Sequence, residues 1–209
     1  MTRRRFDDAA CESLAGCIKE IERNTDAELV IVVRARSGNY AHADYLFGFV
    51  VAFVILNFLI FVPFPFPEYL VPVDIAVAFV LGAIISWRSN SIRRLFSRES
   101  YRKQAVRRAA AAMFYEAGIA NTNAEMGVLI YLSLMERRLE LIADRGVLKR
   151  VPAQDWNHET FELRAIGKDP DPNAFQKAIA QFGKVLATHI PPTGENPNEL
   201  PDMPRFELK

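Results

Sequence analysis

The stretch LIFVPFPFPEYLVPVD, residues 59–74, decides the fold, because three of its four prolines lie between two long apolar runs and the fourth lies near the start of the second. The first run covers residues 46–62 and the second covers residues 69–87. A helix rises about 1.5 Å per residue, so each run has about the length that crosses a hydrocarbon core of about 30 Å. Both runs are therefore predicted to be membrane-spanning helices.

The side chains of the two runs favour insertion into a bilayer. The first run contains 14 Leu, Ile, Phe or Val residues, which outweigh its one polar residue, Asn57. The second contains ten such residues, and its one charge, Asp74, lies near its start, where the cost of burial in lipid is reduced. In a soluble protein, two adjacent helices that are apolar on every face fit only at the centre of a much larger molecule.

The proline-rich segment between the runs is predicted to be the bend of a hairpin that spans residues 45–88. An irregular backbone is not tolerated in hydrocarbon, but at the interface its polar groups can meet water. Phe64, Phe66 and Tyr69 would then lie at the level of the headgroups, with Trp87 at the opposite interface. The lipid bilayer is thus the first predicted partner.

The basic residues predict the orientation of this hairpin. Two arginines precede the first run, the bend has none, and many follow the second run: Arg88, Arg93, Arg94, Arg98, Arg102, Lys103, Arg107 and Arg108. By the positive-inside rule both termini are cytoplasmic. Because this basic segment adjoins a span, it is explained by topology and contact with anionic lipid, and no nucleic-acid partner is expected.

The remaining composition excludes several classes of function. The 26 Lys and Arg residues nearly balance the 25 Asp and Glu residues, which is atypical of a general nucleic-acid-binding chain. Cys11 and Cys17 have neither a zinc-site spacing nor a disulfide framework. The sequence contains no G-x-S-x-G elbow and no phosphate-binding loop of the G-x-x-x-x-G-K type. It therefore offers no motif for a nucleophilic or nucleotide-dependent enzyme.

Outside the hairpin, the chain is predicted to form one α/β domain in two parts, residues 1–38 and 98–190. The first part is an amphipathic helix followed by a buried strand at 27–35. The second part has a helix from 98 with Gly118 at its C-cap, and then two strands, 126–134 and 138–143, joined as a hairpin. A last helix begins after Asp171, and the proline-rich tail, 191–209, is predicted to be extended.

Several segments together resemble the bacterial membrane-anchored branch of the TPM-domain family. They are AELVIVVRA at 27–35, the hairpin, YEAGIANTNAEMGVLIYLSLMERRLELIADRGV at 115–147, Trp156 and ATHIPPTGENPNELPD at 187–202. The resemblance implies a three-layer α/β/α domain with a small central sheet, interrupted by the hairpin. It also implies a location in the bacterial inner membrane.

The resemblance further directs attention to acidic residues at the ends of the strands. It implies a cation site that includes Glu28 and Asp144, and Asp26 and Asp155 are added as further candidate ligands. Such oxygen ligands suit Ca²⁺ or Mg²⁺. From the residues alone, Asp144 before Arg145 and Gly146 is equally read as a turn residue bonded to its own backbone, and Glu28 as a solvated strand start.

Two classes of function follow. The first is a membrane-anchored cytosolic module that binds or stabilises another membrane component. The alternative is a divalent-cation-dependent hydrolase, resembling a phosphatase, that uses the acidic residues at the strand ends. The sequence assembles no base, nucleophile and oxyanion donor in one place, and the module is therefore the preferred hypothesis.

Overall fold

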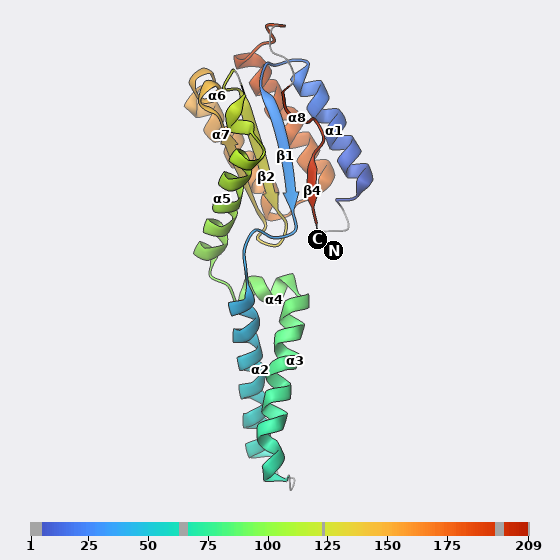
Figure 1. Cartoon of the computed structure of the whole chain (residues 1–209), viewed down its shortest axis with the longest axis vertical. Helices are drawn as coiled ribbons and strands as arrows, with labels where there is room; N and C mark the ends of the chain where they lie inside the picture. Colours follow the sequence, from blue (N-terminus) through green and yellow to red (C-terminus); the bar gives the residue numbers. More distant parts are fainter. Residues whose placement is uncertain (1–5, 63–66, 123, 195–198, 209) are drawn as a thin grey trace. The chain divides into compact units, whose positions relative to one another are not determined.

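The computed structural model describes residues 6–62, 67–122, 124–194 and 199–208. It divides into two compact units. The α/β unit is formed by Met1–Ser37 together with Lys103–Lys209, and the helical unit is Gly38–Arg102. The α/β unit is thus built from both ends of the chain, and the helical unit is inserted between them in the sequence (Figure 1).

A mixed four-stranded sheet forms the centre of the α/β unit, with the strand order β3-β2-β1-β4. β1 is parallel to β2 and to β4, whereas β2 and β3 are antiparallel. The strands are β1 (Glu28–Arg34), β2 (Gly127–Ser133), β3 (Arg138–Ala143) and β4 (Arg205–Glu207). The predicted buried strand and the predicted hairpin of two strands are confirmed.

Helices cover both faces of the sheet. Leu29, Ile31 and Val33 of β1 pack in one core with residues of α1, α7 and α8, while Val30 and Val32 pack in a second core with α5. The alternating side chains of a strand point to opposite faces, so an unbroken apolar run is what such a strand requires. The helices are α1 (Asp8–Glu22), α5 (Glu99–Glu116), α6 (Arg145–Arg150), α7 (Ala153–Lys168) and α8 (Pro172–His189), with a 3-10 turn at Ile119–Asn121.

Helix α8 illustrates how the sequence sets local structure. The Asp171 carboxylate accepts a hydrogen bond from the backbone N–H of Ala174, and Pro172 is the first helical residue, as predicted. Phe175, Ile179 and Phe182 form part of its buried face. Likewise, Gly118 after α5 has a left-handed backbone with φ of 75°, which glycine adopts without steric cost.

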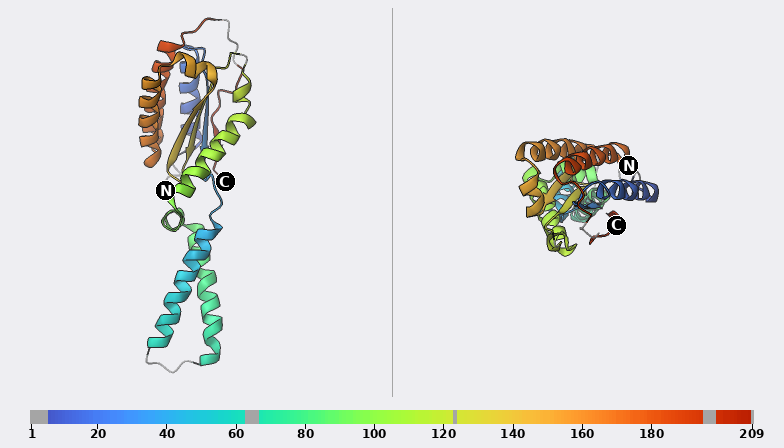
Figure 2. Two further views of the ribbon diagram at one scale, coloured as in Figure 1. Left: turned by 90° about the vertical axis from the view of Figure 1, so that its left-hand side faces the viewer. Right: turned by 90° about the horizontal axis from the view of Figure 1, so that it is seen from above.

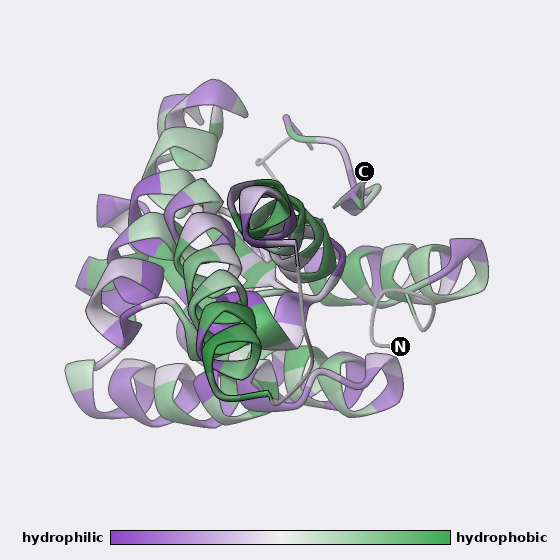
Figure 3. Ribbon diagram, turned by 90° about the horizontal axis from the view of Figure 1, so that it is seen from below, coloured by the Kyte–Doolittle hydropathy of each residue, from purple (hydrophilic) through white to green (hydrophobic). Residues whose placement is uncertain are grey.

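The helical unit contains two long apolar helices. They are α2 (Ala41–Phe61) and α3 (Val71–Arg88), the latter preceded by a 3-10 turn at Glu68–Leu70 and followed by the short helix α4 (Asn90–Leu95). Only 17% of the most apolar window of each is buried, so both are apolar on their exposed surface as well (Figure 3). Both are long and apolar enough to cross a membrane. The bend predicted at Phe64 and Phe66 lies outside the described residues.

Small residues bring α2 and α3 into close contact near one end. A Cβ atom added at Gly48 would lie 2.7 Å from the carbonyl oxygen of Phe79, and one at Gly82 would lie 3.0 Å from the Cα of Gly48. The two helices diverge toward the C-terminal end of α2 (Figure 2). Helix association in lipid depends on such close packing, because apolar surface gives no net drive there.

The structure also differs from the sequence prediction. α2 begins at Ala41, before the predicted start of the first run at 46. The tail is predicted to be extended, and Arg205–Glu207 are extended as the strand β4, but their pairing with Val32–Arg34 of β1 was not predicted. The backbone N–H of Ala35 also donates to the carbonyl oxygen of Glu207. The end of the tail is therefore part of the sheet.

Candidate functional site

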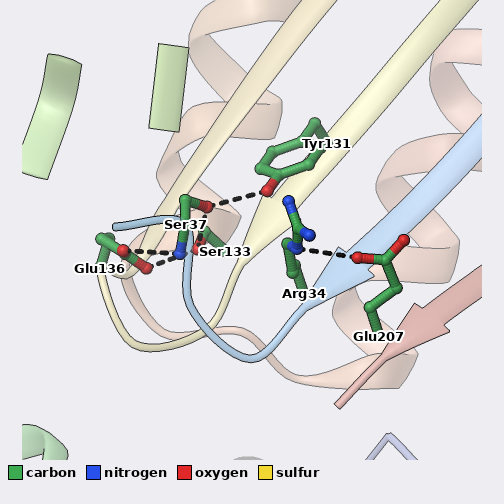
Figure 4. Close-up of polar contacts among 6 residues, drawn as sticks. All are labelled: Arg34, Ser37, Tyr131, Ser133, Glu136 and Glu207. Carbon is green, nitrogen blue, oxygen red and sulfur yellow. Dashed lines mark hydrogen bonds and ion pairs between the residues drawn. The ribbon is translucent and has the colours of Figure 1, made fainter. Parts of the chain in front are cut away.

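A cluster of polar side chains lies at the C-terminal ends of β1 and β2 (Figure 4). These strands are parallel, and the register pairs Arg34 with Ser133, so both strands end at the same edge of the sheet. In open α/β sheets ligands bind outside the carboxyl ends of parallel strands. A ligand of the α/β unit would accordingly be expected at this edge.

Ser37 lies at the centre of the cluster and contacts three side chains. Its backbone N–H donates to Oε1 of Glu136 at 2.8 Å, and its hydroxyl donates to Oγ of Ser133 at 2.7 Å. The same hydroxyl lies 2.9 Å from the phenol oxygen of Tyr131. The hydroxyl of Ser133 in turn donates to Oε2 of Glu136 at 2.5 Å.

These contacts fix the direction of every hydrogen bond in the cluster. Because the Ser37 proton is used toward Ser133, the phenol of Tyr131 is the donor to Ser37. The chain of donors ends at Glu136, which is 3% exposed and uses both carboxylate oxygens as acceptors. Burial raises the pKa of Tyr131, although hydrogen bonds with Ser37 and Arg34 act in the opposite direction. Tyr131 therefore remains protonated and able to donate at neutral pH.

Arg34 extends the cluster to β4. Its Nε atom lies 2.8 Å from Oε2 of Glu207, and both side chains are partly exposed. Burial acts to lower the pKa of Arg34, but its hydrogen bond with Tyr131 and the nearby carboxylate of Glu207 outweigh this effect and raise it. The ion pair thus joins the strand that leaves the unit at Ser37 to the strand formed by the tail.

The arrangement is suited to holding backbone in place rather than to catalysis. A nucleophilic hydroxyl needs a base that accepts its proton when a substrate is bound. Here the hydroxyl of Ser37 donates to Ser133, and both oxygens of Glu136 already accept protein donors. The cluster ties the segment after β1 to the turn between β2 and β3, in which Arg137 has a φ of 52°.

The carboxylates of Asp26 and Glu28, both predicted as metal ligands, bind the segment that precedes β4. Asp26 accepts hydrogen bonds from the backbone N–H and the hydroxyl of Thr193, the latter at 2.7 Å. Glu28 accepts from the backbone N–H groups of Glu199 and Leu200, each at 2.8 Å. Both carboxylates therefore hold main chain of the tail.

Asp144 and Asp155 have other contacts. Asp144 caps α6, accepting from the backbone N–H of Arg145 at 2.7 Å, and its other oxygen is buried without a hydrogen-bond partner in the described part of the chain. Asp155 lies 2.9 Å from Nε2 of His189. Within residues 6–62, 67–122, 124–194 and 199–208, no group of three His, Cys, Asp or Glu side chains is placed to hold a metal ion. The predicted Ca²⁺ or Mg²⁺ site thus lacks a convergent set of ligands there.

Two carboxylates that the sequence did not single out, those of Glu22 and Asp202, lie near each other and near Glu28. Oε1 of Glu22 accepts the backbone N–H of Leu29 at 2.9 Å. Burial raises the pKa of Glu22 to about 7, the bond from Leu29 lowers it, and the carboxylates of Asp202 and Glu28 add to the increase. Burial is also the main reason that the pKa of Glu28 is raised. This part of the unit holds the tail through acidic groups.

The Ser37 cluster was also missed in the sequence. Ser37 and Glu136 alone are 99 residues apart, and no local spacing connects the members of the cluster. One signal was available: Ser133 and Tyr131 are polar residues within an otherwise apolar strand, and buried polar groups require partners.

Comparison with known proteins shows the fold and no more. No family model matches the chain, and no curated protein matches it. The chain is similar to the NMR structure of BA42 protein from the psychrophilic bacterium Bizionia argentinensis, with a TM-score of 0.58, 14% sequence identity, and coverage of 96% of this chain and 94% of that one. At this identity the likeness is one of fold alone.

Proposed function

We propose that the protein is a membrane-anchored module whose α/β unit binds and stabilises another membrane component. The observation that carries this proposal is the pair of apolar helices, each with an exposed apolar surface over most of its length. A soluble protein buries such surface, whereas lipid solvates it. The two helices are the two spans of an anchor, and the bilayer is the first partner.

The distribution of charge supports an orientation with both termini in the cytoplasm. Arg34 and Arg36 precede α2, and Arg88 ends α3 and is followed by further basic residues. The resemblance to the TPM-domain family supports a bacterial inner membrane and a three-layer α/β/α domain. A sheet with helices on both faces is compatible with that arrangement.

The α/β unit is proposed to bind rather than to catalyse, because its chemistry-bearing groups are engaged in hydrogen bonds within the unit. The hydroxyls and carboxylate of the Ser37 cluster form internal hydrogen bonds, and the candidate metal ligands hold the tail, a helix end or His189. The partner would contact exposed apolar side chains of this unit: Tyr115, Leu148, Phe161 and Met203.

Topology is tested with reporters in the full-length protein. A reporter fused at Gly194 is expected to be cytoplasmic, and a short tag inserted before Glu68 is expected to be accessible from outside. The protein should also resist extraction of native membranes with alkaline carbonate. Release into the carbonate supernatant would refute the anchor, and the reverse accessibility would refute the orientation.

Binding is tested by photo-crosslinking in native membranes. A photoreactive amino acid at Tyr115 or Phe161 is expected to give an adduct with one membrane protein, while the same probe at Lys177, an exposed polar position on α8, gives none. Absence of an adduct at all four exposed apolar positions would contradict the module. Mg²⁺-dependent hydrolysis of a phosphomonoester, abolished in Asp144→Asn, would favour the alternative hydrolase instead.

A further inference from the structure

Helix α4, which follows the second apolar helix, is fixed within the helical unit by a buried ion pair. Arg93 donates from Nε to Oδ1 of Asp44 at 2.9 Å and from Nη2 to Oδ2 at 2.6 Å. Ser86 of α3 donates to the same carboxylate at 2.8 Å. The carboxylate at the start of α2 therefore holds both the end of α3 and α4.

Both ends of α4 are also held. The hydroxyl of Ser89 accepts the backbone N–H of Ile92, and the guanidinium of Arg102 donates to the carbonyl oxygens of Arg94, at 2.7 Å, and of Ser97. The ring of Phe96 packs edge-on against Phe47 of α2, with 5.3 Å between the centroids. These contacts fix α4 within the helical unit. The exposed side chains on and beside it are called its outer face here.

The outer face combines apolar and basic side chains. Leu95 is 80% exposed and Trp87 is 59% exposed, although both are large and apolar. Arg88 and Arg98 are exposed, and the guanidinium of Arg94 makes a hydrogen bond with Ser91 that is itself exposed. Residues 75–98 contain no Asp or Glu, and the carboxylate of Asp44 is used by the inward-facing Arg93. Glu99 follows directly, so residues 87–99 apart from Arg93 carry three arginines and one carboxylate, a net positive charge.

We propose that Trp87, Arg88, Arg94, Leu95 and Arg98 form a binding site for the headgroups of anionic phospholipids. This inference rests on the proposed membrane anchor, because the site directly continues α3. One guanidinium group can donate two parallel hydrogen bonds to the oxygens of a phosphate, and Trp is enriched at the membrane interface. An exposed Leu between arginines is the pattern of a segment that inserts its apolar side chain below the headgroups while its charges stay among them.

Continuity with α3 argues against an acidic protein or a nucleic acid as the occupant. Either could bury Leu95 and Trp87, but neither solvates the apolar exposed surface of the helix that the site continues. At the depth of the headgroups the bilayer offers both phosphate groups for the arginines and hydrocarbon for the side chains of Leu95 and Trp87. The buried Arg93 takes no part in lipid binding but positions the outer arginines.

The experiment uses the full-length protein purified in detergent with equal amounts of phosphatidylglycerol and phosphatidylcholine, and measures retained lipids by native mass spectrometry. Phosphatidylglycerol is expected to be enriched over phosphatidylcholine. Near an anionic surface each basic residue contributes about five-fold, so Arg88→Gln with Arg98→Gln should lower the enrichment by about 25-fold. Lys177→Gln with Lys184→Gln removes the same charge from α8 and should leave the enrichment unchanged.

Leu95→Ser is expected to lower the retention of both lipids while preserving their ratio. Equal retention of the two lipids by the unaltered protein, or an enrichment that survives loss of both arginines, would overturn the proposal. So would displacement of phosphatidylglycerol by a short single-stranded oligonucleotide at equal phosphate concentration. A protein that resists carbonate extraction but does not discriminate lipids would refute this inference alone, whereas release by carbonate would refute the anchor itself.

Discussion

Arg93 and Asp44 form an ion pair with two hydrogen bonds, and both residues are buried, at 5% and 7% exposure. They are 49 residues apart, with both apolar helices almost entirely between them. The pair therefore closes the loop of chain that contains the hairpin. Removing one partner would leave the other as a buried, unpaired charge. This costs more folding free energy than replacing both partners by apolar side chains.

Arg93→Met is accordingly expected to destabilise the helical unit by about 3–5 kcal/mol, because the charge of Asp44 stays buried. The double variant Arg93→Met with Asp44→Leu should recover much of this loss. Thermal unfolding of the full-length protein in detergent, monitored by circular dichroism, measures the loss in the single variant and the recovery in the double variant. Arg98→Gln, on the exposed side, is the control. Equal losses in the single and double variants would show that the pair is not the cause.

The close approach of Gly48 to the backbone of Phe79 predicts the effect of adding a side chain at Gly48. A Cβ atom at Gly48 would lie 2.7 Å from a carbonyl oxygen, so Gly48→Ala must push the helices apart. We expect a loss of about 1–3 kcal/mol, typical of an overpacked site, in the same unfolding assay. In Gly16→Ala, by contrast, nothing lies within 4 Å of the added carbon, and the higher helix propensity of alanine should make that variant neutral or more stable. Equal changes of unfolding free energy in Gly48→Ala and Gly16→Ala would contradict the close approach of α2 and α3 at Gly48.

The internal hydrogen bonds of Glu136 predict the effect of its replacement. Glu136→Gln keeps the shape of the side chain but replaces one acceptor by a donor, so either the N–H of Ser37 or the hydroxyl of Ser133 loses its partner. The expected cost is about 1–3 kcal/mol, the penalty for a buried group without a partner. Chemical unfolding of the α/β unit measures it. Glu162→Gln on the exposed side of α7 removes the same charge and should have no effect.

The raised pKa of Glu22 predicts how stability depends on pH. With a pKa of about 7 in the folded protein and an ordinary value of 4.5, the folded state binds more protons than the unfolded state between these values. Stability contributed by this group is therefore complete below about pH 4.5 and falls as the pH rises to about 7. The charges of Asp202 and Glu28 face it and add to the effect.

Glu22→Gln keeps an acceptor for Leu29 but carries no charge at any pH. We expect this variant to exceed the unaltered protein in stability by about 1–2 kcal/mol at pH 8, after allowance for partial exposure, and to match it near pH 4. Unfolding curves at the two pH values give the comparison, with Glu20→Gln on the exposed face of α1 as the control. A difference that is independent of pH would show that Glu22 does not titrate in this range.

The fold was predictable wherever the signal is local. The run ELVIVVR in β1, the cap formed by Asp171, and the apolar residues of α2 and α3 each determine structure through neighbours in sequence. β4 was not predictable, because three partly buried residues at the end of a polar tail gain their hydrogen bonds only from the edge of β1. Strand formation of that kind depends on tertiary context.

The polar sites were less predictable for a similar reason. Asp26 and Glu28 were selected because they lie at a strand end, but their hydrogen bonds go to Thr193, Glu199 and Leu200 in the tail. Sequence identifies which groups can bind oxygen or nitrogen, and only the folded chain decides which partner reaches them. Acidic residues near a strand end therefore indicate a possible ligand site and a backbone clamp equally well.

The last prediction concerns the independence of the α/β unit. Among the residues that the structure describes, the members of both cores come from its own two segments, and none comes from 38–102. Loop-closure entropy changes slowly with length, so replacing residues 38–98 by a short Gly-Ser linker should cost little folding free energy. The product is expected to be soluble and monodisperse, with an α/β circular-dichroism spectrum and cooperative unfolding. Adding Phe182→Ala, which empties a fully buried position, should lower its stability by about 3–5 kcal/mol. An aggregated product would mean that the apolar helices complete the core, and that the unit cannot act as a module apart from its anchor.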